Sequence, residues 1–185
     1  MNAAVIIIDL QEYFYKVDSS KFENKINANI KSLLQFLRKT RIKIFHVITV
    51  YKKDKSNWPE SYKQENTIWC LENSFDSKII QSAIPEENET VIIKKRFSGF
   101  YDTELDKILQ QNGIDTLFIA GYSGDVCVRM TTMDAFNRGY NLFWVSDCIE
   151  SAFEDYHKSE EYIQRLTKLK VVTIEEMEKI IGKEI

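Results

Sequence analysis

Three residues suited to hydrolytic chemistry each follow a separate apolar run of the chain. Asp9 follows residues 5–8, Lys94 follows residues 91–93, and Cys127 follows residues 117–120 after a glycine-bearing turn. A carboxylate beside a thiol can take its proton, and an ammonium group offsets the charge of the thiolate. Cys127 also opens an amphipathic segment, and the N–H groups at a helix N-terminus favour a thiolate. The three residues together predict a nucleophilic cysteine, whereas Cys127 alone would also fit a small core residue.

The rest of the pattern supplies elements that would bring these residues together. Short runs rich in Val, Ile, Leu and Phe predict strands at residues 3–8, 42–51, 90–95, 116–121, 140–146 and 170–174. Apolar residues at helical spacing predict helices between them, including residues 26–37 and 127–137. This alternation predicts an α/β fold: a three-layer, doubly wound, Rossmann-like sheet of about six parallel strands with helices on both faces.

Polar residues follow several of these strands, at the edge where such sheets bind ligands. We therefore expect Asp9, Lys94, Cys127 and Asp147 to lie at one rim. Lys95 would point to the opposite face from Lys94, and strand alternation alone does not choose between the two. The turn at residues 121–124, with the N–H of Cys127, could direct backbone donors at an oxyanion.

Three motifs of the chain resemble those of the isochorismatase-like cysteine hydrolases, within the nicotinamidase and isochorismatase superfamily. They are Asp9-Leu10-Gln11 with Phe14, Lys94-x-Arg96-Phe97-Ser98-Gly99-Phe100, and Gly121-x-x-x-Asp125-x-Cys127-Val128. The resemblance extends over residues 4–169 and implies a catalytic triad of Asp9, Lys94 and Cys127. It implies that Cys127 is the nucleophile, that Asp9 shuttles protons, and that Lys94, rather than Lys95, gives electrostatic support to a thioester-like intermediate.

The resemblance also indicates residues around the triad. Family members typically have a cis peptide here between Tyr122 and Ser123, which would turn the Ser123 N–H toward an oxyanion. Phe14, Gln11 and Tyr122 adjoin the motifs and are the expected substrate-binding residues. Other aromatic side chains that could wall a flat or apolar substrate are Tyr13, Tyr15, Trp58, Trp69, Phe97 and Phe100.

The presence of the Cys127 thiol limits the type of bond that we expect the protein to cleave. Members that act on isochorismate carry another residue where Cys127 stands, so the resemblance implies acyl chemistry on a small amide-type C–N bond. Nicotinamidases hold a metal through a D-x-H pattern, but Asp54 has no suitable histidine nearby and the chain has only two. We expect a metal-independent cysteine hydrolase without a cofactor. The alternatives are a non-catalytic binding protein of this fold and a nicotinamidase-like amidase with an atypical site.

The length and composition of the chain indicate its domain number, its possible partners and its location. A length of 185 residues with 44% hydrophobic residues predicts a single domain over residues 1–185. A net charge of −3 without a basic stripe argues against nucleic acid, and no apolar run reaches the ~20 residues that span a membrane. Three cysteines without a C-x-x-C pair and an N-terminus without a signal-peptide pattern predict a cytoplasmic protein. The expected partners are a small-molecule substrate and, from the resemblance, further copies in a homodimer or homotetramer.

One segment fits neither periodicity. Residues 52–75 carry Trp58, Trp69 and Cys70, and they form an unusually long connection for a compact domain. Such connections tend to be lids or binding elements.

Overall fold

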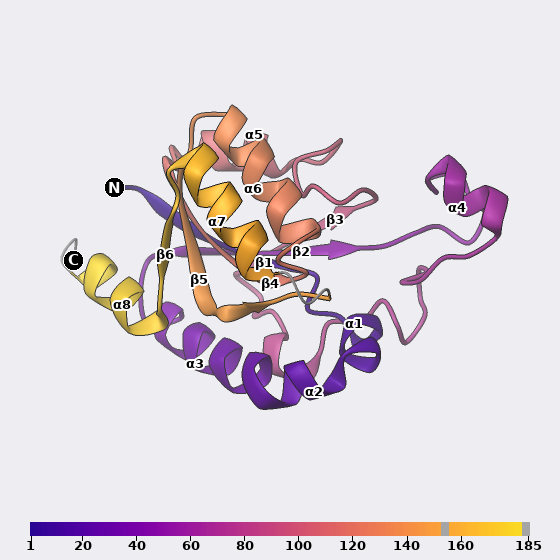
Figure 1. The fold of residues 1–185 in the computed structure, drawn as a ribbon, viewed down its shortest axis with the longest axis horizontal. Coiled ribbons are helices and arrows are strands. Elements are labelled where there is room, and N and C mark those ends of the chain that lie inside the picture. Colours follow the sequence, from indigo (N-terminus) through magenta and orange to yellow (C-terminus); the bar gives the residue numbers. More distant parts are fainter. Residues whose placement is uncertain (153–155, 183–185) are drawn as a thin grey trace.

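The computed structural model describes residues 1–152 and 156–182, and its centre is a parallel sheet with helices on both faces (Figure 1). The six strands are β1 (Ala3–Ile8), β2 (Lys43–Thr49), β3 (Thr90–Lys94), β4 (Thr116–Tyr122), β5 (Asn141–Glu150) and β6 (Lys170–Val172). They lie in the order β3-β2-β1-β4-β5-β6, and each neighbouring pair is parallel. The predicted α/β fold is confirmed. The strand order reverses between β1 and β4, which makes this the expected place for a ligand.

The helices are distributed between the two faces of the sheet and its edge (Figure 1). They are α1 (Glu12–Val17), α2 (Ser19–Lys21), the π-helical turn η1 (Phe22–Ile26), α3 (Asn27–Leu37), α4 (Glu60–Glu65), the 3₁₀ turn η2 (Gln81–Ala83), α5 (Leu105–Gln111), α6 (Cys127–Asn137), α7 (Tyr156–Thr167) and α8 (Ile174–Gly182). Helices α3 and α8 cover one face of the sheet, and α5, α6 and α7 cover the other (Figure 1). No described helix is long and apolar enough to cross a membrane.

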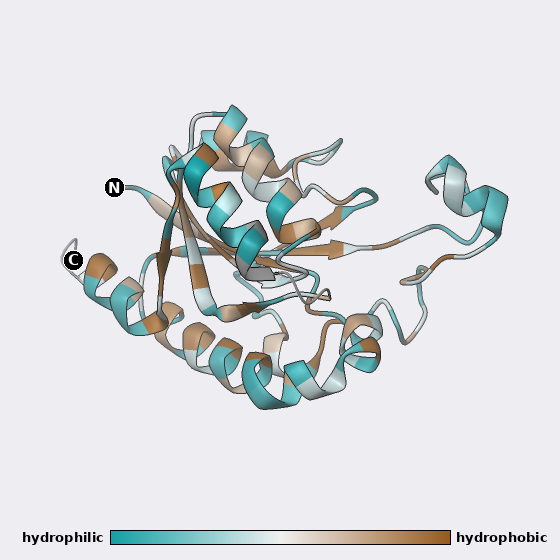
Figure 2. Cartoon of the chain, in the orientation of Figure 1, coloured by the Kyte–Doolittle hydropathy of each residue, from teal (hydrophilic) through white to brown (hydrophobic). Residues whose placement is uncertain are grey.

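The central strand β1 divides its side chains between two cores. Val5 and Ile7 pack into the core beneath α3 and α8, whereas Ile6 and Ile8 pack into the core beneath α5 and α6. Successive side chains of a strand point to opposite faces, so a strand covered on both faces must be apolar throughout. The strands are accordingly hydrophobic along most of their length, while the helices alternate hydrophobic and hydrophilic bands (Figure 2).

Strand β5 is longer than the sequence predicts and corrects the expectation for Asp147. The pairing of β4 with β5 shifts between Ile119 and Gly121, so β5 accommodates extra residues and continues to Glu150. Asp147 therefore lies within the strand rather than after its end. Its Oδ2 accepts a hydrogen bond of 2.8 Å from the backbone N–H of Ile174, at the start of α8.

Residues 52–75 contain only one regular element, α4, which extends beyond the edge of the sheet (Figure 1). Two contacts hold the base of the segment. Within the segment, the indole N–H of the buried Trp58 donates to the carbonyl of Lys52 at 2.7 Å, and Leu71 joins it to the fold through a β-bridge with Tyr51. The segment therefore returns to the carboxyl end of β2.

Candidate active site

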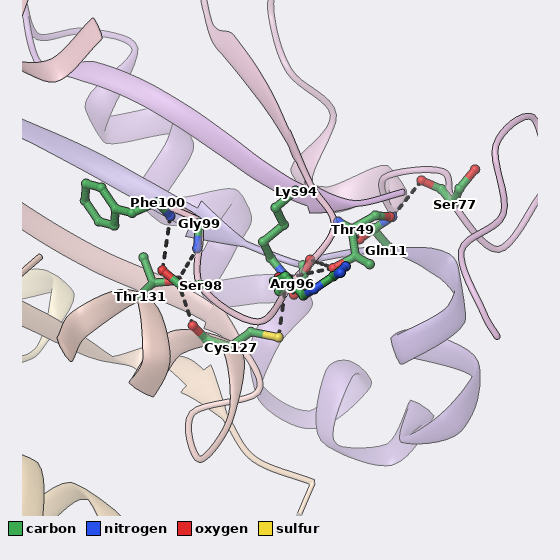
Figure 3. Close-up of polar contacts among 11 residues, drawn as sticks. Gln11, Thr49, Ser77, Lys94, Arg96, Ser98, Gly99, Phe100, Cys127 and Thr131 are labelled. Atoms are coloured by element: carbon green, nitrogen blue, oxygen red, sulfur yellow. Dashed lines mark hydrogen bonds and ion pairs between the residues drawn. The ribbon is translucent and has the colours of Figure 1, made fainter. Parts of the chain in front are cut away.

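The fold brings Asp9, Lys94 and Cys127 together from three elements. Asp9 directly follows β1, Lys94 is the last residue of β3, and Cys127 is the first residue of α6. The ammonium Nζ of Lys94 lies 2.7 Å from Asp9 Oδ2 and 3.5 Å from Cys127 Sγ (Figure 3). Asp9 and Lys94 are almost fully buried, and Cys127 is 7% exposed. Lys95 instead pairs with Asp102 at 2.5 Å, so of these two lysines it is Lys94 that contacts Cys127.

Thr49, which the sequence analysis did not single out, joins two members of this group. Its hydroxyl donates to Asp9 Oδ1 at 2.9 Å and accepts from Lys94 Nζ at 2.7 Å. Thr49 is the last residue of β2, which pairs with β1. A polar residue at the end of a strand next to β1 is the sequence feature that could have identified it. The predicted strand continued to residue 51, which hid that position.

Gln11 lies behind the triad and does not line the cavity described below. Its side-chain amide donates to the carbonyls of Thr49 and Ser77, each at 2.9 Å, and its Oε1 accepts the N–H of Thr49 at 2.9 Å (Figure 3). Gln11 is fully buried, and these bonds use both ends of its amide. Gln11 therefore fixes the backbone of Thr49 through hydrogen bonds, and the expectation that Gln11 contacts the substrate is not supported.

The electrostatics of the group favour a protonated thiol at rest. Burial raises the pKa of the Cys127 thiol; the Lys94 ammonium opposes this shift, and the Asp9 carboxylate adds to it. Burial alone would lower the pKa of Lys94, but the Asp9 carboxylate beside it raises that pKa overall. This corrects the expectation that the helix N-terminus holds Cys127 as a thiolate.

The turn between β4 and α6 leaves two backbone donors at or near Cys127. The peptide bond between Tyr122 and Ser123 is cis, as the resemblance implies. The carbonyl of Ser123 accepts the N–H groups of Val126 and Val128, each at 3.0 Å, which closes the turn onto α6. Within the described ranges, the N–H groups of Ser123 and Cys127 have no acceptor. Two such donors next to a nucleophile can bind an oxyanion.

A cavity of about 340 Å³ opens above Cys127. Its described lining comprises Tyr13, Phe14, Val17, Thr49, Tyr51, Tyr62, Trp69, Arg96, Phe97, Tyr122, Ser123, Val126, Cys127 and Ala152. The rings of Tyr13 and Trp69 are stacked, with centroids 5.5 Å apart and planes 10° apart. The walls are therefore mostly aromatic, as a small-molecule site often is.

The lining includes five of the aromatic residues expected from the sequence, Tyr13, Phe14, Trp69, Phe97 and Tyr122. The others lie elsewhere: Tyr15 packs edge-on against Phe22, Trp58 is buried, and Phe100 belongs to the core beneath α5. Tyr51 and Tyr62, from the base and helix of the 52–75 segment, were not expected. A second hollow of about 800 Å³ between α3 and η2 contains no member of the triad.

The described residues hold no group of three or more His, Cys, Asp or Glu side chains that could bind a metal ion. Asp54 is exposed, and its Oδ1 accepts the N–H of Ser56 at 2.9 Å. His46 is buried in β2, where its Nε2 lies 2.8 Å from Glu89 Oε2, and burial lowers its pKa. It is thus a satisfied core histidine, as its place in a predicted strand suggested.

The chain is similar to known proteins of one family. A family model described as Isochorismatase domain matches residues 3–176. The chain is similar to Enterobactin synthase component B of Escherichia coli (strain K12), 26% identical over 161 residues, which cover 84% of this chain and 55% of that protein. It is also similar to a ureidoacrylate amidohydrolase of Methylobacterium radiotolerans, 35% identical over 89 residues, which cover 48% of this chain and 34% of that protein. The chain thus spans about half the length, or less, of these curated relatives.

A solved structure shows the same architecture. An isochorismatase family protein from Desulfovibrio vulgaris subsp. vulgaris str. Hildenborough superposes with a TM-score of 0.83 at 25% identity, over 98% of both chains. The family model spans nearly the whole sheet and includes the rim where Asp9, Lys94 and Cys127 meet. On this evidence of sequence and architecture together, the chain belongs to the isochorismatase family.

Proposed function

We propose that this protein is a metal-independent cysteine hydrolase that cleaves a small amide-type C–N bond through a thioester-like intermediate. The observation that carries the proposal is the contact of Lys94 Nζ with both Asp9 Oδ2 and Cys127 Sγ, at 2.7 and 3.5 Å. This contact supports the proposal because a thiol that can act as a nucleophile, a carboxylate that can accept its proton and an ammonium group lie close together. The cavity above Cys127 leaves room for a small substrate.

Acylation begins when Cys127 Sγ attacks the carbonyl carbon and its proton passes to the Asp9 carboxylate. Negative charge then develops on the carbonyl oxygen, where the N–H groups of Ser123 and Cys127 can donate to it. As the tetrahedral intermediate collapses, the C–N bond breaks and Asp9 returns the proton to the leaving nitrogen. Lys94 keeps its proton throughout and compensates the charge that moves between sulfur and carboxylate.

Deacylation repeats these roles with water. Asp9 takes a proton from a water molecule, the resulting hydroxide attacks the thioester, and the proton returns to the departing sulfur of Cys127. The net reaction adds one water across the C–N bond and restores the thiol. No step requires an oxidant or a second substrate.

Amide bonds are the preferred target for two reasons. A thiol forms a thioester readily with an acyl group, which a vinyl ether does not offer. One similar protein, from Methylobacterium radiotolerans, is named an amidohydrolase, which supports the same bond type here. Its substrate is not transferred to this chain.

The decisive experiment is an ammonia-release screen over small amides, ureas and carbamates. We expect release with the unaltered protein and none with Cys127→Ala, while Cys148→Ala, a buried cysteine of β5, retains activity. Mass spectrometry of quenched reactions should find the acyl group on Cys127. Turnover that persists in Cys127→Ala would refute the cysteine mechanism. Absence of turnover across the screen would favour a non-catalytic binding protein instead, and loss of activity on chelation would refute metal independence.

A further inference from the structure

Arg96 is the one charged side chain among the described residues that line the cavity above Cys127. The remaining described lining is aromatic, aliphatic or hydroxyl-bearing, apart from the thiol itself. We propose that Arg96 makes this cavity a site for an anionic group, so that the substrate is a small amide that also carries a carboxylate. The inference rests on the proposed hydrolase function, because it names the substrate class which that hydrolase would accept.

The guanidinium of Arg96 is fixed in place by contacts that leave part of it available. Its Nη1 donates to the backbone carbonyls of Asn57 at 2.9 Å and Lys95 at 2.6 Å, and its Cζ lies 5.9 Å from the centre of the Tyr101 ring. Within the described part of the chain, Nε and Nη2 have no hydrogen-bond partner. A half-buried guanidinium held in this way offers further donors in a rigid arrangement that suits a carboxylate.

Two acids near this region form ion pairs with lysines, although Asp102 is also close enough to Arg96 to interact with its charge. Asp9 lies 2.7 Å from Lys94, and Asp102 lies 2.5 Å from Lys95. The described lining itself contains no acidic residue. The charge of Arg96 is therefore not cancelled by a carboxylate of the described cavity wall, and an anionic ligand would be attracted there.

The size and lining of the cavity limit which anionic ligands can bind there. A volume of about 340 Å³, roughly 9 Å across if spherical, holds a single ring or a short chain. The stacked Tyr13 and Trp69 rings present flat apolar surface to it. A compact, planar amide with its carboxylate directed at Arg96 and its carbonyl at Cys127 matches these features.

The charge preference can be measured without knowing the substrate. Iodoacetate and iodoacetamide are nearly the same size, and both alkylate thiols, but only iodoacetate carries a carboxylate. We expect Arg96→Gln to lower the iodoacetate-to-iodoacetamide rate ratio at Cys127 by at least about fivefold. This is the effect expected for unit charges ~8 Å apart at an effective dielectric constant of ~40.

Two further variants separate charge from structure. Arg96→Lys retains the charge and should keep the ratio within about twofold of the unaltered protein. Lys52→Gln removes an exposed cation next to the lining residue Tyr51 and should also leave the ratio unchanged. An unchanged ratio in Arg96→Gln, or an equal fall in Lys52→Gln, would refute a specific role for Arg96. Arg96→Met serves as the second neutral variant if Arg96→Gln does not fold.

A matched pair of amides tests the substrate class itself. 4-Carbamoylbenzoate and 4-nitrobenzamide have the same shape, but only the first is anionic. We expect Arg96→Gln to lower kcat/KM at least about fivefold for the anionic amide and less than twofold for the neutral one. If Arg96→Gln hydrolyses both amides with an unchanged kcat/KM, the anion site is refuted but the hydrolase proposal is not. An Arg96-dependent alkylation ratio without any Cys127-dependent ammonia release would refute the hydrolase proposal and leave the anion site.

Discussion

The hydroxyl of Thr49 allows a quantitative test of how the triad is held. Thr49→Val keeps the shape of the side chain but removes the donor to Asp9 Oδ1 and the acceptor for Lys94 Nζ. A hydrogen bond to a charged group contributes about 1.5–3 kcal/mol, and loss of its buried partner costs a similar amount. Asp9 and Lys94 still hold each other through Oδ2, so the two losses do not add fully. We expect the free energy of unfolding to fall by about 3 kcal/mol.

Thr167 in α7 provides the matched control. Its buried hydroxyl also makes two hydrogen bonds, donating to the carbonyl of Ile163 at 2.8 Å and accepting the N–H of Leu169 at 3.3 Å. Both partners are neutral, so Thr167→Val should cost only about 1–2 kcal/mol. Thr49→Ser keeps the hydroxyl and should lose less than Thr49→Val.

Urea unfolding of the four proteins, followed by fluorescence and circular dichroism, measures these differences. The rate at which iodoacetamide alkylates Cys127 in the folded variants gives a second readout, because displacement of Lys94 alters the charge beside the sulfur. Equal losses in Thr49→Val and Thr167→Val, with an unchanged alkylation rate, would show that Thr49 does not position the triad.

Three other outcomes follow from the structure. Iodoacetamide should label Cys127 before Cys70 and Cys148, because those two cysteines are fully buried, and equal labelling of all three would contradict this. The rate at which Cys127 is alkylated should rise from pH 7 to 9, because burial raises the pKa of its thiol. Burial lowers the pKa of His46 in the folded protein, so below the ordinary histidine pKa of about 6.5 the unfolded state binds more protons than the folded state. The free energy of unfolding therefore falls as the pH drops below about 6.5. His46→Gln should make the free energy of unfolding, measured by urea titration, less dependent on pH between about pH 7 and 5. Gly121→Ala should not yield soluble folded protein, because its Cβ would lie 2.1 Å from the carbonyl oxygen of Ile8 at a φ of +121°; a normal melting temperature would disprove this.

Local patterns were sufficient to predict the features that depend on one strand or helix at a time. The apolar run of β1 and the periodicity of α6 identified those elements with their observed bounds. The rule that parallel strands present their carboxyl ends at one edge then placed Asp9, Lys94 and Cys127 together.

Features that depend on pairing between distant segments were not predictable in this way. The extra residues of β5 arise from a shift in its register with β4, and they place Asp147 within the strand, where it binds the start of α8. Gln11 binds residues 38 and 66 positions away, so its polar side chain near a motif looked like a ligand contact. No local pattern distinguishes a polar side chain that serves the backbone from one that serves a substrate.

The protonated state of Cys127 also determines how the protein meets oxidants. Peroxides react with thiolates, and cysteines that act as redox sensors combine a low pKa with solvent access. Cys127 has neither property at rest, because burial raises its pKa and only 7% of its surface is exposed. In the mechanism that we propose, Cys127 loses its proton only when it attacks a substrate, so between turnovers its buried thiol is protected from oxidation to a sulfenic acid.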